Sequence, residues 1–590
     1  MTGPAPSATT EKTKRPGGDA LAIAGYVLLA LAATWPMIAD LHQYVISEYM
    51  DVINSFGNMW WFHEAVCVLH TSPWHNPEID YPYGYSMVLL PVWIPYDALS
   101  LPIIAAYGAD GLPVAFNLIS ILSLALTGYA MFVLARYLTR DPGASFVAGI
   151  ALALTPYRYW NLTRWHVTCL ELVVFTMYFF LRAVREEKRA AWVGLAVFSA
   201  LLFYTSPNYT ADLALALPVM LVFLAATERD TLKLDAALLR LAKAGALAGA
   251  VCAPLIVRII LEIAHGPVPL LQPDSLRIPY SANLLGFFTP GSTLRAYSWL
   301  TPHLPYSDPG LKREFGIASY EIFMGWFTLM LAVVGVLARR RESRLLLVLA
   351  ALFLVLSLGP RVQVGQHALT FSAPYAWLEH VLPWLKVDRT PVRHSAIALI
   401  CVAALAAMGL AAFKDLAAPR RRAMIQAAAA VAVVLEFNQA PLKLDSIPVP
   451  AYVYEIKNDP VYGSVLDLPF LPDTKRLGGY YMMHHYKPLA IQLTSRIGDP
   501  KYESSALFKY LNHPRVWLSL SGGPRAAALD ALRRELSERK VRYIAAYPRF
   551  MEPDDLKGLL QVMTELGPDA VLVENDLHVV YRYPPWGHTE

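Results

Sequence analysis

The feature that most constrains the fold is a series of apolar runs whose lengths approach that of a membrane-spanning helix. The clearest runs are residues 20–39, 113–135, 242–262, 319–338, 344–359 and 395–413. About 20 apolar residues in a helix cross the hydrocarbon core of a bilayer. Only 16% of the 590 residues are charged, whereas soluble domains average about 25%. Lipid is therefore a major solvent of this chain, and we expect a mostly α-helical, polytopic membrane protein.

Basic clusters predict the orientation, because cytoplasmic loops of membrane proteins are enriched in Lys and Arg. The clusters lie at 12–15, 135–140, 182–189, 229–243, 339–344 and 414–422. Residues 41–112 contain neither Lys nor Arg, so they should face the outside while the N-terminus faces the cytoplasm. The apolar segment 88–107 contains three prolines and Asp97. Residues 41–112 should lie outside and the basic cluster 135–140 inside, so a single span, 113–135, connects them. We therefore expect 88–107 to be a partly inserted helical hairpin and not a span.

Shorter apolar segments complete the alternation of spans. They are 143–157, 167–184, 190–206, 209–226 and 423–437. The total is about 11 spans within residues 19–440, preceded by a polar tail, 1–18, that we expect to be disordered. Three long outer segments follow from this topology, at 40–112, 263–318 and 360–394. A helical chain of this kind favours a bacterial inner membrane, because outer-membrane proteins are barrels.

The composition changes near residue 445. Short strand-like segments such as "GSVLDLPF" and "LHVVYRY" alternate with amphipathic helical segments such as "PDDLKGLLQVMTEL". We therefore expect residues 445–590 to form an extracytoplasmic α/β domain. The length of this segment is normal for a single domain.

Several classes of function lack their motif. The chain has no Walker loop, no GxGxxG opening a helix and no GxSxG elbow. A net charge of +4 is too small to suggest nucleic acid as a partner. His63, His70 and His75 lie near Glu64 and Glu78, but their spacing matches no established metal pattern. No cofactor is indicated with certainty, although a divalent metal is possible. Chemistry outside the cell would need an activated substrate delivered in the membrane.

Asp51 is an acidic residue shortly after the first apolar run, and Trp60 and Trp61 follow it. At this position a carboxylate can meet a lipid-borne substrate, but it can equally be solvated or cap a helix. The tryptophans can line a cavity or belong to an interfacial aromatic belt.

Two further groups of ionisable residues lie at predicted outer ends of spans. The first comprises Arg158, Arg164, His166 and Glu171. An ionisable residue at membrane depth is a functional hypothesis, although Glu171 can also simply pair with an arginine. The second group is Arg389 and Arg393, which would share a helical face if that segment is helical. Together they can bind a phosphate bidentately or contact lipid headgroups.

These residues resemble the GT-C class of membrane glycosyltransferases, which includes oligosaccharyltransferase catalytic subunits, protein mannosyltransferases and lipid A aminoarabinose transferases. A closer similarity, to a group of bacterial GT-C-like proteins, covers nearly the whole chain. It is carried by Asp51, Trp60, Trp61, Asn76–Pro77, "YPYG" at 81–84, "NLLGFFTP" at 283–290, "VDRTPVRH" at 387–394, "VLDLP" at 465–469 and "YYMMHHYKPL" at 480–489.

The resemblance implies an inverting sugar transfer at the outer membrane face. The donor would be a polyprenyl-phosphate-linked sugar, and the acceptor a glycan, lipid or protein. Asp51 would act as general base, and the aromatic residues Trp60, Trp61 and Tyr81 would shape the substrate cavity. Arg389 and Arg393 would neutralise the leaving phosphate, with further substrate contacts from Arg158, Arg164, His166 and Glu171.

The chain differs from the expected pattern at several positions. Asn283 stands where the closer group is expected to have Asp, and His394 where it is expected to have Phe. A shorter outer segment, residues 157–171, is the second outer segment along the chain; it lacks a DxD or DxE pair, which leaves metal dependence open. Two other functions stay open as well. One is transport or flipping of a lipid-linked substrate, for which internal repeats are typical. The other is a non-catalytic role in envelope assembly, with the C-terminal domain binding a partner.

Overall fold

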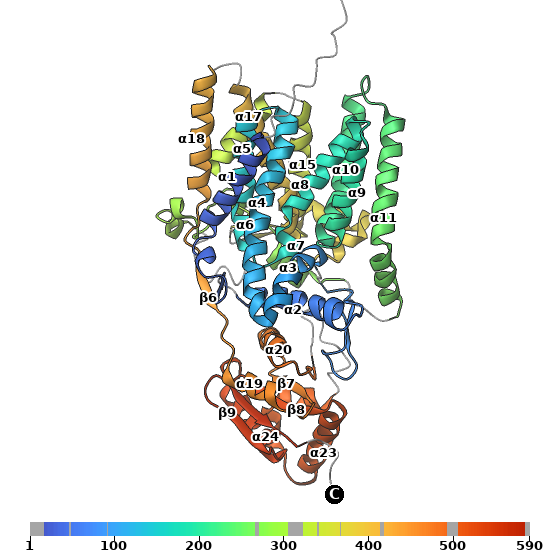
Figure 1. The fold of residues 1–590 in the computed structure, drawn as a ribbon, viewed down its shortest axis with the longest axis vertical. Helices are drawn as coiled ribbons and strands as arrows, with labels where there is room; N and C mark the ends of the chain where they lie inside the picture. The colour runs from blue at the N-terminus through green and yellow to red at the C-terminus, as the bar shows by residue number, and fades with distance from the viewer. Residues whose placement is uncertain are drawn as a thin grey trace, which may run out of the picture.

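A bundle of long helices carries a smaller α/β domain at one end (Figure 1). The computed structural model describes residues 17–46, 49–90, 93–265, 271–304, 322–338, 341–365, 367–413, 418–491 and 505–584. Most of the expected N-terminal tail and parts of the 263–318 segment lie outside these residues. The long helices stand side by side, α2 lies across their lower ends, and the C-terminal domain lies below α2.

Every apolar segment predicted as a span contains a helix. These helices are α1 (Gly17–Ala33), α4 (Leu112–Thr139), α5 (Pro142–Ala153), α8 (Leu170–Arg185), α9 (Arg189–Phe203), α10 (Pro207–Thr227), α11 (Leu234–His265), α14 (Trp326–Leu337), α15 (Arg341–Ser357), α17 (Ser395–Ala412) and α18 (Pro419–Phe437). Five helical stretches of the described chain are long and apolar enough to cross a membrane. The prediction of a mostly helical membrane protein is confirmed, whereas the count of about 11 spans and their orientation stay predictions.

Two helices show opposite relations to the core. The stretch Pro391–Ala412, which contains α17, is 94% buried over its apolar window, as expected for a helix that is apolar on all sides. Gly335 of α14 and Gly409 of α17 allow their backbones to touch, because a Cβ on Gly409 would lie 2.0 Å from the Leu331 carbonyl oxygen. By contrast, α11 is only 17% buried over its apolar window and lies at the edge of the bundle in Figure 1, so it presents a lipid-compatible face.

The segment expected as a partly inserted hairpin contains α3 (Ile94–Tyr107), which continues through a 3₁₀ turn (Gly108–Gly111) into α4. It packs against α2 (Tyr49–His63) and α4. Short elements complete this region. They are α6 (Pro156–Trp160), α7 (Trp165–Thr168), α12 (Asp274–Arg277), β1 (Tyr44–Ile46), β2 (His75–Asn76), β3 (Tyr85–Ser86), β4 (Arg361–Val364), β5 (His367–Ser372), α16 (Pro374–Val381) and β6 (Leu444–Ser446).

The C-terminal region contains a four-stranded sheet in the order β7-β8-β10-β9. β7 (Ser464–Leu468) and β8 (Val541–Ala546) are parallel, whereas β10 (Val579–Arg582) pairs antiparallel with β8 and with β9 (Ala570–Glu574). The helices of this region are α19 (Ala451–Asn458), α20 (Pro472–His485), α22 (Arg515–Ser519), α23 (Gly522–Glu538) and α24 (Pro553–Glu565). A separate hydrophobic cluster that includes Trp517, Leu532 and Leu559 forms its core.

Several contacts tie this C-terminal domain to the first outer segment. β1 pairs antiparallel with β6, and Leu489 bridges both Ile79 and Val465. Arg539 lies 3.1 Å from Asp80, and α20 packs against α2. The domain therefore meets the bundle at the segment that carries Asp51.

Candidate active site

Asp51 lies where three segments distant in sequence meet. Its carboxylate is in the first turn of α2, and its side chain is 20% exposed. Oδ2 accepts a hydrogen bond from Arg164, which lies between α6 and α7. Oδ1 lies 3.3 Å from Arg476 of α20, in the C-terminal domain. A partly exposed carboxylate held by two arginines can accept a hydrogen bond, and then a proton, from a bound substrate hydroxyl.

The position of Asp51 follows from how α2 is anchored. Val52 and Phe56 are fully buried on one side of the helix, and Ser55 donates to the backbone oxygen of Thr163 at 3.3 Å. The hydrogen bond holds α2 against the second outer segment, while Phe56 packs on Phe116 of α4 and Tyr480 of α20. An acidic residue in the first turn is also favoured by the helix dipole.

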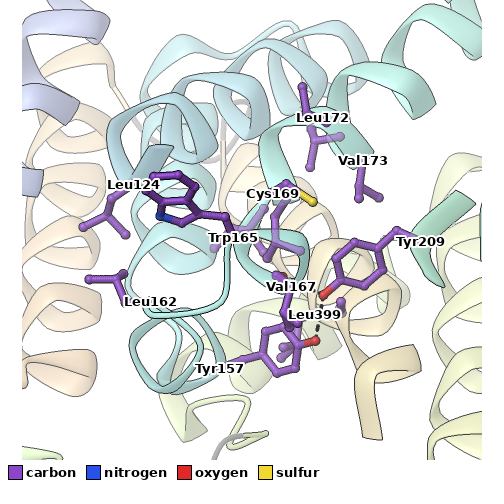
Figure 2. Packing of buried hydrophobic residues seen from close by; sticks show 14 of the residues in the cluster. Leu124, Tyr157, Leu162, Trp165, Val167, Cys169, Leu172, Val173, Tyr209 and Leu399 are labelled. Atoms are coloured by element: carbon purple, nitrogen blue, oxygen red, sulfur yellow. Dashed lines mark hydrogen bonds between the residues drawn. The ribbon is translucent and has the colours of Figure 1, made fainter. Parts of the chain in front are cut away.

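The second outer segment is built into the core rather than lying over it. Figure 2 shows Tyr157, Trp165 and Val167 pointing into apolar surroundings, with the Tyr157 hydroxyl facing that of Tyr209. These two hydroxyls are 2.7 Å apart, and Tyr209 also donates to the Val167 oxygen at 2.7 Å. Trp165 donates to Ser120 at 3.2 Å. The segment therefore presents Arg164 from a fixed backbone.

Arg158 and Glu171 belong to a buried polar network between four helices. Glu171 accepts hydrogen bonds from Tyr96 at 2.5 Å, Ser123 at 2.6 Å and Thr127 at 2.8 Å. Arg158 donates to Ser123 at 3.0 Å, which connects it to Glu171 through that hydroxyl. The two residues are 0% and 2% exposed. Such burial favours a role in fixing the helices, and direct substrate contact by either residue stays a prediction.

The predicted aromatic residues and His166 have separate surroundings. The His166 ring stacks on Trp93 at 5.4 Å. Trp60 and Trp61 are buried, 4% and 2% exposed, and therefore pack inside the protein and not as an exposed belt. Trp60 faces Tyr486 of the C-terminal domain at 6.2 Å. Tyr81 also contacts that domain, with Tyr462 at 6.0 Å; its predicted role at the substrate is untested.

Arg389 and Arg393 do not share a helical face as expected. Arg389 precedes the 3₁₀ turn Pro391–His394, which contains Arg393. The reason is local: proline disfavours helical backbone in the residue before it, and Thr390 has non-helical angles, φ −131° and ψ 68°. Arg389 lies over the Tyr280 ring at 5.2 Å. The two arginines lie just before the start of α17, and they lack the predicted i, i+4 helical geometry.

Beside these arginines lies a cluster that sequence reasoning missed. His394 Nδ1 is 2.6 Å from Asp212 Oδ1 of α10, and its Nε2 is 3.2 Å from Asp388 Oδ2. Burial alone would raise the pKa of Asp388, but the hydrogen bond and charge of His394 lower it below its ordinary value. The cluster ties the 387–394 segment to α10. Asp212 and His394 are 182 residues apart, so no local pattern connects them.

Arg476 was also missed, because only the docking of α20 brings it to Asp51. A weak signal existed in "DTKR" at 473–476, a charged start to a helix followed by the "YYMMHHYKPL" motif. The fit of a divalent metal is poor in the described residues: no group of three or more His, Cys, Asp or Glu there could hold one. The two arginines at Asp51 would also repel such an ion.

Comparisons with known proteins give a family and a fold. Residues 22–435 match the family described as Domain of unknown function (DUF6311). No curated protein matches the sequence.

Solved structures match along most of the chain. The oligosaccharyltransferase AglB of Archaeoglobus fulgidus, in complex with an inhibitory peptide and a dolichol-phosphate, has 11% identity and a TM-score of 0.51; the match covers 90% of this chain and 69% of that one. The arabinofuranosyltransferase AftD from Mycobacteria has 14% identity and a TM-score of 0.58, over 98% of this chain and 40% of that one. ArnT of Cupriavidus metallidurans has 12% identity and a TM-score of 0.48, with 96% and 98% covered. The first two likenesses show a GT-C-like glycosyltransferase fold, as the sequence predicted.

Proposed function

The chain belongs to the DUF6311 family, and we propose that it is a membrane glycosyltransferase. It moves a sugar from a polyprenyl-phosphate-linked donor to a glycan, lipid or protein acceptor at the outer face of a bacterial inner membrane. One observation carries the proposal: in a GT-C-like fold, Asp51 of the first outer segment meets an arginine of the second segment and an arginine of the C-terminal domain.

In the proposed step Asp51 is the general base. The acceptor hydroxyl gives its proton to Asp51 while its oxygen forms a bond to the anomeric carbon. The bond from that carbon to the phosphate oxygen breaks, and its electron pair leaves with the phosphate. A single displacement of this kind inverts the anomeric configuration. General base catalysis typically contributes ~10²–10⁴-fold to such a rate.

To act as a base, Asp51 needs one carboxylate oxygen free for the acceptor, and Oδ1 becomes free if Arg476 moves away from it. Arg476 lies 3.3 Å from Asp51 Oδ1 and 3.2 Å from its other carboxylate partner, Asp473. An incoming acceptor can therefore take the place of Arg476 at Oδ1 while Arg476 keeps Asp473. Arg164 stays on Oδ2 and orients the carboxylate.

The leaving phosphate requires cations at the membrane surface, since charge develops on its oxygen as the bond breaks. Arg389 and Arg393 are the proposed ligands. Both lie where the 387–394 segment enters α17, and both are partly exposed. Orientation follows the basic clusters: the N-terminus is cytoplasmic, about 11 spans follow, and the domain of residues 445–590 is outside.

The test is mass spectrometry of envelope glycans and glycolipids in a deletion strain complemented with wild type or with Asp51→Asn. Asn keeps the size of the side chain and removes its ability to take the proton. Asp40→Asn is the matched control, because Asp40 lies in the same loop and accepts two backbone N–H bonds that Asn can also accept. We expect wild type and Asp40→Asn to restore a missing sugar, and Asp51→Asn to fail at equal membrane levels.

Two results would contradict the proposal in different ways. Full restoration by Asp51→Asn refutes the base assignment. A deletion strain whose glycans and glycolipids are all unchanged refutes sugar transfer itself, and then transport or envelope assembly explains the fold better.

A further inference from the structure

A cavity lies between the first outer segment and the link to the C-terminal domain. It has a volume of about 410 Å³, which is within the ~300–1,000 Å³ of small-molecule sites. Its polar lining comes from His42, Gln43, Asp110, Ser446 and His484.

The face of α20 connects this cavity to Asp51. Arg476, Tyr480 and His484 recur every fourth residue, so they share one side of the helix. Arg476 contacts Asp51, Tyr480 faces Phe56 of α2 at 6.0 Å, and the rings of Tyr480 and His484 are 4.9 Å apart. Eight residues of helix rise about 12 Å. The cavity therefore lies about two helical turns from the carboxylate.

One histidine of the cavity lining has a buried polar atom without a partner. His484 is 6% exposed, and its Nε2 has no hydrogen-bond partner among the described residues. Burial lowers the pKa of His484, so the ring is neutral at pH 7. A buried polar group without a partner is costly, and the His484 ring lies beside the cavity with a hydrogen-bonding atom that no described residue uses.

The lining also selects the chemistry of the ligand. Asp110 disfavours a phosphate, and the described lining residues include neither Lys nor Arg. No metal cluster forms among the described residues. Val45, Pro113 and Ile447 supply an apolar wall, while carboxylate, imidazole and amide groups supply hydrogen bonds. An apolar face with several hydroxyls is the chemistry of a neutral sugar ring.

We propose that this cavity binds an uncharged hexose or pentose unit of the acceptor. The assignment to the acceptor rests on the proposed function. It follows from the charges, because the phosphate of a lipid-linked donor needs cations that this cavity lacks and that Arg389 and Arg393 provide elsewhere. Bound here, the sugar unit would lie at the end of the α2–α20 contact that also holds Arg476 at Asp51.

The test is saturation-transfer NMR on the full chain in lipid nanodiscs, with methyl glycosides of common neutral hexoses and pentoses as probes. We expect at least one glycoside to bind wild type, and its affinity to fall tenfold or more in Asp110→Asn and in His484→Ala. His484→Gln can still hydrogen-bond and should recover part of the loss. The matched control is Asp576→Asn, because Asp576 is an exposed carboxylate outside the cavity. Asp51→Asn should bind the probe as wild type does.

The outcomes separate this inference from the proposed function. Absence of binding to wild type by every probe overturns it. So does binding that Asp110→Asn and His484→Ala leave unchanged, even in a chain that transfers sugar. If the probe binds as expected but wild type restores no glycan in the deletion strain, the sugar site stands and the transferase function fails. Asp110 is exposed, so its variant keeps the test valid if His484→Ala does not fold.

Discussion

Removing His394 should destabilise the protein strongly, because it leaves two carboxylates facing each other without their common partner. The side chains of Asp212, His394 and Asp388 are only 4%, 9% and 14% exposed. Breaking a buried ion pair by deleting one partner typically costs about 3–5 kcal/mol. With two carboxylates affected, we expect His394→Ala to lie in that range, since the shorter contact, 2.6 Å to Asp212, dominates.

The measurement is the free energy of unfolding of the full chain in mixed micelles, from titration with sodium dodecyl sulfate. His380→Ala is the matched control, because His380 is an exposed histidine in the same outer region. A surface change of this kind is expected within about 0.5 kcal/mol of wild type. A double-mutant cycle with Asp212→Asn adds the interaction energy. The double variant should lose less than the sum of the single losses, because it removes one of the stranded charges.

The reasoning fails if His394→Ala costs no more than His380→Ala. It also fails if the two single losses simply add, because the histidine and Asp212 would then be energetically independent. In either case the 387–394 segment would be positioned by its apolar contacts, and the three ionisable groups would be incidental.

Two other predictions concern packing and pH. Gly409→Val should lower the thermal midpoint of the full chain, with an overpacking cost of about 1–3 kcal/mol or more, because the new Cβ would lie 2.0 Å from the Leu331 oxygen. Gly245→Val is the control, because Gly245 faces open space on α11. Equal midpoints for the two variants would contradict the close crossing of α14 and α17. In the C-terminal domain, burial raises the pKa of Asp467 to about 7 despite a hydrogen bond from Tyr547. The folded state therefore binds more protons than the unfolded state between about pH 4 and 7, and stability should fall by up to about 4 kcal/mol as pH rises through that window. Asp467→Asn should flatten this slope between pH 5 and pH 8 in thermal unfolding, and an unchanged slope would assign it to other groups.

The sequence is sufficient for those parts of the fold that depend on local composition. Apolar runs predicted the helices because a span must be apolar over its whole length, and the segment without Lys or Arg directed attention to Asp51. The expected i, i+4 pairing of Arg389 and Arg393 is wrong because Pro391 changes the local backbone before α17 begins. Pro391 was the signal in the sequence, because a proline disfavours helical backbone in the residue before it.

Contacts between distant segments could not be predicted, because no spacing encodes them. Arg476 acquires a role only when α20 packs on α2, and His394 only when α10 approaches the 387–394 segment. In both cases a group far along the chain partners an acid, and only one of those acids, Asp51, was singled out in the sequence. Buried or half-buried acids in an apolar chain are costly without partners. Their presence is therefore a reason to expect an unseen cation or donor, even where the sequence cannot say which.

Under the proposed function, the C-terminal domain has a part in the chemistry for the same reason. Asp51 lies outside the helix core and needs both a positioned partner and shielding from water. Arg164 supplies the partner from a fixed segment, while α20 places Arg476, Tyr480 and His484 along one face, from Asp51 to the proposed sugar cavity. One helix thus contacts the base and the cavity together. A domain joined to the bundle only by a flexible link could not keep a cavity and a base about 12 Å apart along a helix axis. The pairing of β1 with β6 and the bridge from Leu489 to Ile79 supply the required fixed connection.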